Sequence, residues 1–589
     1  MQKGRKAQTR VRRRAFVLFL ALLFSFGAAR AKESRILTDA QQGKISRLEA
    51  LRLYGLRMFA PERLPQRYQA EARLPLKCGT EIVRALKENW ALLKPEDRKL
   101  FSRYFQRPVL PYSYVSPEGR FRLHYALGGY DGVPRKDADS SGVPDFIERA
   151  GEYLDYSYHF EVDTLGYQPP PSDYSVDGDE IDVYFKNINA YGYTDFDRQI
   201  PETPYNDWTS YITMDNDFAG PGYYAQGLDG LRVTCAHELF HVIQLGYNYR
   251  DEDLFFFEMS STWMEDRVYD DVNDYQHYIH YYLDHIDWPL SLANGYREYG
   301  ASIFLKFIQE NYSDDVIRRA WEHIRQEHSI KALDASLREV NSSFAEAFIT
   351  FGLWNYFTGD RSTLAKFYRE GDQYPQVQFN RSYVFQSDTT LLDSTYSLSL
   401  KYYGLTPQQS GFYTLQQNHA FPSIWRTGVI IDRPTGIFMN SFSGSADGNL
   451  DFLNGFQDVT LIAANVQIPA TLGDLLMDYQ SARFQYVLRR QKMKGSLRVF
   501  PNPFQPAKHT ILSVRARLPK TGNYECFIFS EAGRFVRRIP LRLFPEGEAV
   551  VQIPWDGTDE NGREVASGIY LCVLASEKVR VLAKFALVR

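Results

Sequence analysis

The hydrophobic pattern changes along the chain, and these changes limit the folds that the sequence can adopt. From residue 32 to about 107, apolar residues recur every three or four positions, as they do in amphipathic helices. From 108 to about 365, strand-like runs such as GRFRLHYAL and DEIDVYFKNI come first and helical runs follow, an order typical of an α+β domain. From 366 onward the runs are short, β-like and separated by turn residues.

This order of patterns predicts a multidomain protein, because 589 residues exceed what one core can hold. We expect a helical N-terminal region at 32–107, an α+β domain at 108–365 and a β-sandwich at 366–494. A separate small β-domain is expected at 495–589, where WDG and ENG are turn signals between strands.

Residues 1–31 have the three parts of a secretory signal peptide. The basic stretch MQKGRKAQTRVRRR is followed by the apolar run AFVLFLALLFSF and the cleavage pattern ARA. The apolar run is short for a membrane span, which disfavours the alternative of an N-terminal anchor. No other run approaches membrane length, so we expect a secreted protein that is cut before Lys32.

Removal of the signal peptide changes the charge of the chain. The peptide contains eight basic residues and no acidic residue, so the mature chain keeps 60 basic and 72 acidic residues, a net charge of −12. A net negative charge argues against nucleic acid as a partner.

The cysteines are too few for a disulfide framework, since the chain contains only Cys78, Cys235, Cys526 and Cys572. Cys526 and Cys572 both lie in strand-like runs near the C-terminus, where they either pair or remain buried free thiols. Cys235 lies in an apolar helical run, and we expect it in the core.

The run TCAHELFHVIQLGYNY contains the H-E-x-x-H motif, formed by His237, Glu238 and His241. Residues four apart share one face of a helix, so both imidazoles can bind one cation. A zinc ion with three protein ligands keeps a position for water and lowers the pKa of that water to about 7. Glu238 can then accept the proton as the water attacks a carbonyl. The alternative is two helix histidines that bind no metal.

The third ligand must come from another part of the chain. The longer motif H-E-x-x-H-x-x-G-x-x-H fails, because Gly246 is displaced and Tyr247 occupies the place of the third histidine. Glu258 and Glu265 both lie in the helical run FFFEMSSTWMED. They are seven residues apart and share a helix face, so spacing alone does not choose between them.

The pattern HELFH, sixteen residues and then EMSSTWMED resembles the gluzincin clan of zinc metallopeptidases. Aminopeptidase-N-like members have H-E-x-x-H, about eighteen residues and then N-E-G-F-A-x-W-x-E. The resemblance implies that Glu258 is the third ligand, that Glu238 is the general base and that Glu265 supports the site. This chain departs from the clan pattern at Met259, where a glycine is usual, and its spacer is two residues shorter.

The same resemblance implies a donor for the oxyanion of the transition state, which in this clan is a tyrosine shortly before a glycine. GYREYGASIF offers Tyr296 and Tyr299, of which we prefer Tyr299; the alternative is helix packing. The exopeptidase signature G-x-M-E-N is absent from the sequence, which favours an endopeptidase.

Residues 110–320 also resemble a family of secreted bacterial metalloproteases, through FRLHY, DSSGVPDFIE, DVYFKNINAYGYTD, HELFHVIQ and STWMEDRVYDDVNDY. The resemblances together imply a zincin-like domain in a secreted zinc endopeptidase, which hydrolyses extracellular proteins through a metal-bound water. The rival hypothesis is a non-catalytic cell-surface protein that binds other molecules on a zincin-like scaffold.

The run DADSSGVPDFIE fits the pattern of a calcium loop, in which oxygen ligands recur at fixed positions. We expect the ion to stabilise the fold rather than take part in catalysis. The alternative is a solvated acidic turn. The expected ligands are the side chains of Asp137, Asp139, Ser141, Asp145 and Glu148 and the carbonyl of Val143.

Cys78 lies in LPLKCGTEI, ahead of the expected catalytic domain. This segment resembles the cysteine-switch segment of some secreted zinc proteases, in which a thiolate fills the open zinc position until the segment is cleaved. The resemblance implies that residues 32–107 act as a propeptide. The alternative is that Cys78 is a buried free cysteine.

The last block contains VFPNPFQP and ends in SGIYLCVL, and it resembles immunoglobulin-like C-terminal modules of secreted bacterial proteins. Type IX secretion sorting domains share this form. Pro501 to Phe504 and Gly568 to Tyr570 carry the match. The resemblance implies a partner in the secretion machinery or at the outer-membrane surface; the alternative is a plain structural β-domain.

Overall fold

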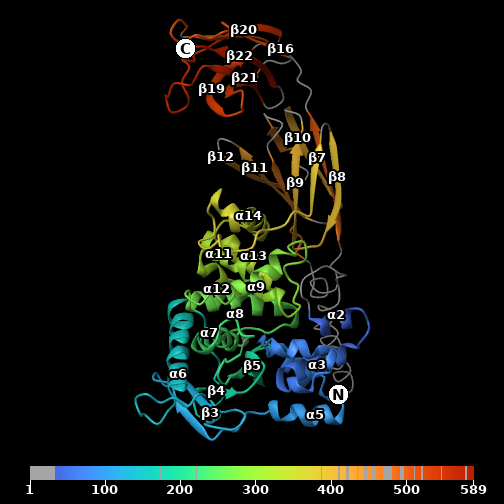
Figure 1. Ribbon diagram of the computed structural model, residues 1–589, viewed down its shortest axis with the longest axis vertical. Helices are drawn as coiled ribbons and strands as arrows, with labels where there is room; N and C mark the ends of the chain where they lie inside the picture. Colours follow the sequence, from blue (N-terminus) through green and yellow to red (C-terminus); the bar gives the residue numbers. More distant parts are fainter. Residues whose placement is uncertain are drawn as a thin grey trace. The chain divides into compact units, whose positions relative to one another are not determined.

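The computed structural model shows a multidomain protein with helices and several β-sheets (Figure 1). The signal peptide expected at 1–31 lies outside the described residues. The chain forms two compact units, of which the first reaches to Gln378 and the second holds most of the chain from Phe379 onward. The structure describes residues 34–589 except 173, 175, 177, 221, 386–387, 409–410, 420–423, 434–435, 444–447, 453–457, 469–480, 491–495, 510, 519–521, 545–546 and 577–579.

The first unit contains a six-stranded mixed sheet with the order β1-β5-β6-β4-β3-β2. β1 pairs in parallel with β5, which runs antiparallel to β6. β6, β4 and β3 are parallel to one another, and β2 closes the other edge as an antiparallel strand. The strands are β1 (Leu76–Cys78), β2 (Tyr112–Val115), β3 (Phe121–Tyr125), β4 (Ile181–Lys186), β5 (Ala190–Gln199) and β6 (Trp208–Asp215).

Helices follow the last of these strands, as the sequence pattern predicts. α7 packs against β5, β6 and its neighbouring helices α6 and α8, and it is buried on nearly every face. α6 lies between β3 and β4, where we expected only strands; its apolar side chains pack against the sheet. The helices are α6 (Asp145–Tyr158), α7 (Gly227–Leu245), α8 (Leu254–Val268), α9 (Gln276–Leu283), α10 (Arg297–Gly300), α11 (Ser302–Asn311), α12 (Asp314–His323), α13 (Ser329–Glu339) and α14 (Phe344–Tyr356).

The expected N-terminal region is helical, but it does not form a separate body. Ser46 caps one of its helices by accepting a hydrogen bond from the backbone N–H of Glu49. Its apolar side chains share one core with Ile188, Ala190 and Tyr193 from the neighbourhood of β5. It also supplies strand β1. Its helices are α2 (Arg35–Gln41), α3 (Arg47–Phe59), α4 (Thr80–Glu88) and α5 (Pro95–Phe101).

The boundary between the units lies between Gln378 and Phe379, later than the expected division at 365. Aromatic residues in this stretch stay with the first unit. Tyr368 is buried and donates a hydrogen bond to Asn355 over 2.8 Å. The hydroxyl of the buried Tyr374 lies 2.7 Å from that of Tyr275. These contacts explain why the stretch belongs with the helices.

The second unit begins with two facing sheets, in agreement with the expected β-sandwich. One has the order β13-β10-β15-β8 and the other β12-β11-β14-β9-β7. Side chains from both sheets form a common apolar core. The strands are β7 (Arg381–Phe385), β8 (Thr389–Thr395), β9 (Ser399–Pro407), β10 (Gly411–His419), β11 (Trp425–Arg433), β12 (Gly436–Ser443), β13 (Gly448–Phe452), β14 (Val459–Asn465) and β15 (Ala482–Arg490).

The C-terminal strands form two further sheets, β16-β17-β20 and β19-β18-β21-β22, around a core of their own that includes Trp555. Cys526 and Cys572 lie in this core as free cysteines, with their Sγ atoms 3.6 Å apart. The strands are β16 (Ser496–Phe500), β17 (Leu512–Leu518), β18 (Gly522–Ser530), β19 (Phe535–Phe544), β20 (Gly547–Ile553), β21 (Gly568–Ala575) and β22 (Arg580–Leu587). Among all the described helices of the chain, none has the length and apolar character needed to cross a membrane.

Candidate metal centre

The H-E-x-x-H motif lies near the middle of α7, as its apolar helical run predicts. Glu258 lies on α8, which packs directly against α7. Burial is nearly complete, with exposed fractions of 2% for His237 and His241 and 3% for Glu258. The packing of the two helices therefore brings the three side chains together inside the first unit.

Four side chains converge there, and we call Cys78, His237, His241 and Glu258 the buried cluster. Their ligand atoms all lie within 4.8 Å of one another. The two histidine Nε2 atoms are 3.1 Å apart, and Oε2 of Glu258 lies 3.3 Å and 3.5 Å from them. Tetrahedral zinc with bonds of about 2.0–2.3 Å requires separations of about 3.3–3.7 Å between donor atoms. The buried cluster therefore fits zinc.

Cys78 is the fourth donor, although it precedes His241 by 163 residues. Its Sγ lies 3.5 Å from Nε2 of His241. Burial and the carboxylates of Glu238 and Glu258 raise the pKa of Cys78 well above its usual range. A cation among these groups would oppose both effects, since thiolates bind zinc well.

Each histidine of the buried cluster is oriented by a polar partner on its other ring nitrogen. Nδ1 of His237 lies 2.7 Å from Glu265, and Nδ1 of His241 lies 2.7 Å from Oε1 of Gln244. Partners of this kind hold the Nδ1–H tautomer and leave Nε2 to bind a metal. Glu265 thus lies behind His237, while Glu258 lies among the Nε2 atoms.

Lys77 contacts the carboxylate that orients His237. Its ammonium group is buried and donates to Glu265 over 2.8 Å and also to Asp274. Burial lowers the pKa of Lys77, but Asp274 and Glu265 outweigh burial and raise it. Sequence reasoning missed Lys77 and Gln244. Only Gln244 had a local signal, because it follows His241 by three positions on one helix.

The charges of the buried cluster depend strongly on one another. Burial lowers the pKa of His237, but hydrogen bonds with Glu258 and Glu265 raise it overall to about 9. Burial raises the pKa of Glu258, but the charges of His241 and His237 and their hydrogen bonds lower it to about 2. The metal-free site therefore keeps Glu258 ionised and holds a proton on His237, in the place where a cation would bind.

Glu238 points from α7 toward β5. Its Oε2 accepts a hydrogen bond of 2.7 Å from Thr194, whereas its Oε1 has no hydrogen-bond partner among the described residues. Burial raises the pKa of Glu238, although His237 and His241 oppose this. A Cβ placed on Gly192 would lie 3.0 Å from Glu238, so β5 approaches the carboxylate closely. Thr194 was not found from the sequence.

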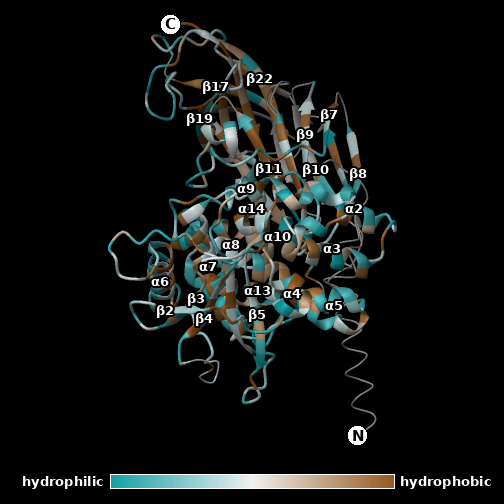
Figure 2. Ribbon diagram, turned by 60° about the horizontal axis from the view of Figure 1, so that its bottom comes forward, coloured by the Kyte–Doolittle hydropathy of each residue, from teal (hydrophilic) through white to brown (hydrophobic). Residues whose placement is uncertain are grey.

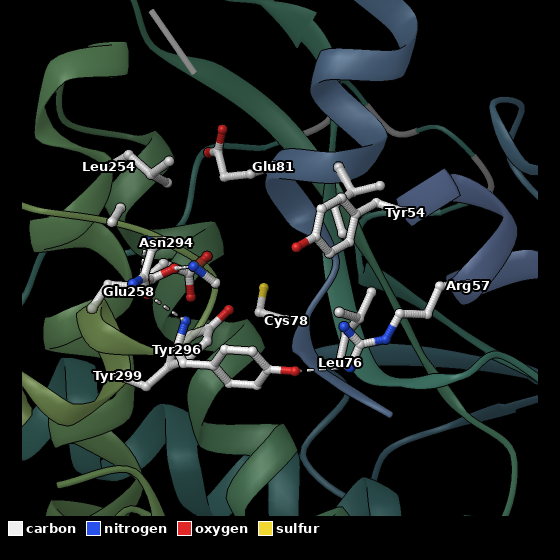
Figure 3. Close-up of a pocket in the computed structure, with 14 residues that line it drawn as sticks. Tyr54, Arg57, Leu76, Cys78, Glu81, Leu254, Glu258, Asn294, Tyr296 and Tyr299 are labelled. Carbon is white, nitrogen blue, oxygen red and sulfur yellow. Dashed lines mark hydrogen bonds between the residues drawn. The ribbon is translucent and has the colours of Figure 1, made fainter. Parts of the chain in front are cut away.

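A cavity of about 60 Å³ lies beside the buried cluster. Figure 3 shows Tyr54 and Arg57 on one side of it, Tyr299 and Glu258 on the other, and Cys78 between them. The preferred oxyanion donor, Tyr299, is 4% exposed, and its ring centroid lies 6.5 Å from that of His237. Tyr296, the alternative, accepts a hydrogen bond of 3.0 Å from Arg57.

The expected calcium loop follows β3 and runs into the first turn of α6, and we call residues 137–148 the acidic loop. Carboxylate oxygens of Asp137, Asp139 and Asp145 lie within 4.8 Å of one another. The Ser141 hydroxyl donates to Glu148 over 2.7 Å and to the Val143 carbonyl over 3.2 Å. Residues 138–142 of the loop are exposed, and Figure 2 shows hydrophilic stretches in the loops beside α6. The Lys136 ammonium lies 2.8 Å from Asp145.

Comparison with known proteins finds similarity to one family and points to no activity. Residues 147–420 match a family of unknown function, DUF6055. This match includes the H-E-x-x-H motif and Glu258, whereas Cys78 and most of the acidic loop lie before it. A search of curated proteins finds no match.

Solved structures resemble only small parts of the chain. They include PorZ, a surface component of the type IX secretion system of Porphyromonas gingivalis, at 21% identity over 18% of this chain with a TM-score of 0.12. Latent PorU of the same bacterium is 15% identical over 36% of this chain, with a TM-score of 0.14. A calcium-binding mutant of β-glucuronidase 2 from Bacteroides uniformis is 11% identical over 30%, with a TM-score of 0.11. The chain spans 14%, 19% and 26% of these proteins, respectively. TM-scores this low do not support a shared overall fold or a shared function.

Proposed function

We propose that the first unit is a secreted zinc-dependent endopeptidase with a zincin-like, gluzincin-type site that hydrolyses extracellular proteins. The observation that carries the proposal is Oε1 of Glu238, which has no hydrogen-bond partner among the described residues, next to the buried cluster, whose four ligand atoms lie within 4.8 Å of one another. A buried carboxylate oxygen without a hydrogen-bond partner costs folding free energy, so its presence calls for a functional explanation. Acceptance of a proton during catalysis is such an explanation.

The residues of the site divide the work of peptide hydrolysis. Zinc bound by His237, His241 and Glu258 would polarise the scissile carbonyl and lower the pKa of water. Glu238 would accept the proton of the attacking water at Oε1, while the Thr194 hydroxyl holds Oε2 in place through a hydrogen bond.

Other groups orient the histidine ligands and stabilise the transition state. Glu265 and Gln244 keep the two imidazoles aimed at one point. The Tyr299 hydroxyl would donate to the oxyanion, which requires the protonated phenol. Burial, Glu258 and Cys78 raise the pKa of Tyr299 well above its usual value, so the phenol stays protonated at neutral pH.

The test compares Cys78→Ala with the double variant Cys78→Ala/Glu238→Gln, because Cys78 lies where it would fill the open metal position. We expect zinc in both proteins and cleavage of casein that falls by about 10²–10⁴-fold in the double variant. Glu346→Gln in the Cys78→Ala background is the control, since Glu346 is an exposed glutamate on α14.

Bound zinc with equal, negligible cleavage in both proteins would contradict the proposal. That result would favour the rival, a non-catalytic cell-surface protein on the same scaffold. Binding of extracellular proteins by the Glu238→Gln chain, measured without cleavage, would then be the next assay.

For residues 495–589 we propose an immunoglobulin-like sorting domain that engages type IX secretion machinery or the outer-membrane surface. The resemblance of VFPNPFQP and the two-sheet arrangement around Trp555 support this. Deletion of residues 495–589 should retain the protein in the cell. Normal extracellular delivery of the truncated chain would reject the role.

For the acidic loop we propose a structural Ca²⁺ site. Supporting it, three carboxylates converge, and Gly142, with φ of +88°, allows the sharp turn that such loops contain. The ligand set is all oxygen, which suits calcium rather than zinc. Its effect would be on stability, because none of its expected ligands belongs to the buried cluster.

A further inference from the structure

We infer that the N-terminal segment, residues 34–107, keeps this site inactive by occupying it in the manner of a bound peptide. Strand β1 takes the sheet edge where an extended substrate segment would pair, and Cys78 at its end takes the fourth metal position. The inference rests on the proposed function, and it assigns to the site both a substrate conformation and a form of regulation.

The first support is the pairing of β1 with β5. The backbone N–H of Leu76 donates to Asn189 over 3.0 Å, and that of Gly79 donates to Gly192 over 2.9 Å. Gly192 is the residue of β5 that lies against Glu238. An extended peptide that adds a strand to a sheet edge binds through main-chain hydrogen bonds of this kind. β1 therefore occupies the edge nearest the proposed general base.

The second support is that two consecutive residues of β1, Lys77 and Cys78, both contact the site. Cys78 directs its sulfur into the buried cluster, while Lys77 reaches the carboxylates of Glu265 and Asp274 behind it. Both side chains are nearly inaccessible to solvent. The segment thus contributes to the ligand set and to the layer that orients His237 at the same time.

Departure of the segment leaves a site that can still bind metal. His237, His241 and Glu258 all lie on α7 and α8, outside the segment. Asp274 keeps hydrogen bonds from the Tyr191 hydroxyl at 3.0 Å and the Ala225 N–H at 2.9 Å when Lys77 is gone. Three ligands would remain, with one position free, as in catalytic zinc sites.

The third support is the wall of the cavity. Tyr54 and Arg57 of the segment line it opposite Tyr299 (Figure 3), and Ile82 of the segment also lines it. Arg57 is fully buried and donates to Tyr296 over 3.0 Å. Removal of the segment would therefore open one whole side of this cavity and uncover the β5 edge.

The chain also offers a place for cleavage. Residues 106–111 connect the segment to β2 without helix or strand, and Val109 is 97% exposed. Exposed irregular stretches are the preferred sites of proteolysis. A cut there would separate the segment from the rest of the first unit without breaking a helix or strand.

The test uses the chain from Lys32, loaded with Co²⁺ for spectroscopy and with Zn²⁺ for activity. We compare wild type, Cys78→Ala and the matched control Cys235→Ala, which removes a buried free thiol outside the buried cluster. We expect a near-ultraviolet thiolate-to-cobalt band in wild type and Cys235→Ala but not in Cys78→Ala. Hydrolysis of an unfolded protein by the uncleaved chain should rise at least about tenfold in Cys78→Ala only.

Each outcome decides one of the two hypotheses. Absence of the thiolate band in wild type overturns the inference, whatever the activity. A band together with equal, substantial hydrolysis by wild type and Cys78→Ala also overturns it, while the proposed function stands. A band, full zinc content and no hydrolysis by Cys78→Ala or by the chain cut at 106–111 would make the centre structural. That result rejects both the proposed function and the inhibitory role of the N-terminal segment.

Discussion

The buried cluster and the acidic loop both gather potential metal ligands within 4.8 Å, yet they are built in opposite ways. The buried cluster combines nitrogen, sulfur and oxygen donors from β1, α7 and α8 in the interior of the first unit. The acidic loop takes only oxygen donors from one continuous stretch, and the side chains that supply them are exposed or half-buried. The first donor set suits zinc and the second suits calcium.

The difference teaches how tightly each site is coupled to the fold. Ions inside a protein are costly unless they are paired, so loss of a cation from the buried cluster leaves groups that must change protonation. Water can replace a cation at the acidic loop at little cost. Each prediction below concerns one of the two sites, and the predictions follow in order of decreasing effect.

The largest effect should come from His241→Ala. This change removes a donor whose Nε2 lies within 3.5 Å of three other ligand atoms. We expect zinc content close to zero by atomic emission and a clear fall in the midpoint of thermal unfolding, since metal binding contributes to folding free energy. Calcium binding at the acidic loop should not change. Full zinc content in His241→Ala would contradict the assigned ligand set.

The second effect is a dependence of zinc affinity on pH. The pKa of His237 in the metal-free site is about 9 against an ordinary value of 6.5, so its proton stabilises the metal-free fold below about 6.5, and this contribution is lost as pH rises through about 9. Zinc binding releases this proton and also the proton of the Cys78 thiol, whose pKa lies well above its usual range, so the apparent affinity should fall about a hundredfold per pH unit below 9. Glu258, with a pKa of about 2, stays ionised throughout. Competition titration with a zinc-binding dye measures this; a flat profile from pH 6 to 8 would contradict it.

The third effect is that of Glu265→Gln. Loss of this carboxylate leaves Nδ1 of His237 without its charged partner, and it leaves Lys77 with Asp274 alone. Zinc affinity should fall by about 10–100-fold, with the three ligands retained. Glu339→Gln is a matched control, because Glu339 also lies 2.7 Å from a histidine nitrogen, that of His323, but on the surface. An equal loss of affinity in both variants would show that the effect is not local to the site.

The smallest effect belongs to the acidic loop. Calcium at about 100 times its dissociation constant should stabilise the fold by about 2.7 kcal/mol, which raises the unfolding midpoint by a few degrees at most. Asp139→Asn should abolish this rise and leave zinc content unchanged. Calcium titration during scanning calorimetry is the measurement, and a rise that persists in Asp139→Asn would place the ion elsewhere.

The same comparison explains what the sequence could predict. The acidic loop could be proposed from the sequence because all its oxygen donors lie within twelve residues. The H-E-x-x-H motif could be recognised because a spacing of four residues puts both histidines on one face of a helix. Spacing did not choose between Glu258 and Glu265, because the choice depends on how α8 packs on α7. The structure lays Glu258 among the Nε2 atoms, where the resemblance had put it.

Cys78, Lys77 and Thr194 could not be placed from sequence with the same certainty. β1 has only three residues, too few for a hydrophobic pattern, and its position depends on pairing with a strand more than a hundred residues later. Thr194 looks like any strand threonine until β5 is seen to pass Glu238. For the same reason the expected N-terminal region read as a separate helical body, whereas it completes the sheet and core of the first unit.

X-ray absorption at the zinc edge of the uncleaved chain tests the central claim most directly. The account predicts zinc with one sulfur neighbour at about 2.3 Å and three nitrogen or oxygen neighbours at about 2.0–2.1 Å, and no sulfur neighbour in Cys78→Ala. A zinc site without sulfur in the uncleaved wild-type chain, or no bound zinc at all, would contradict it.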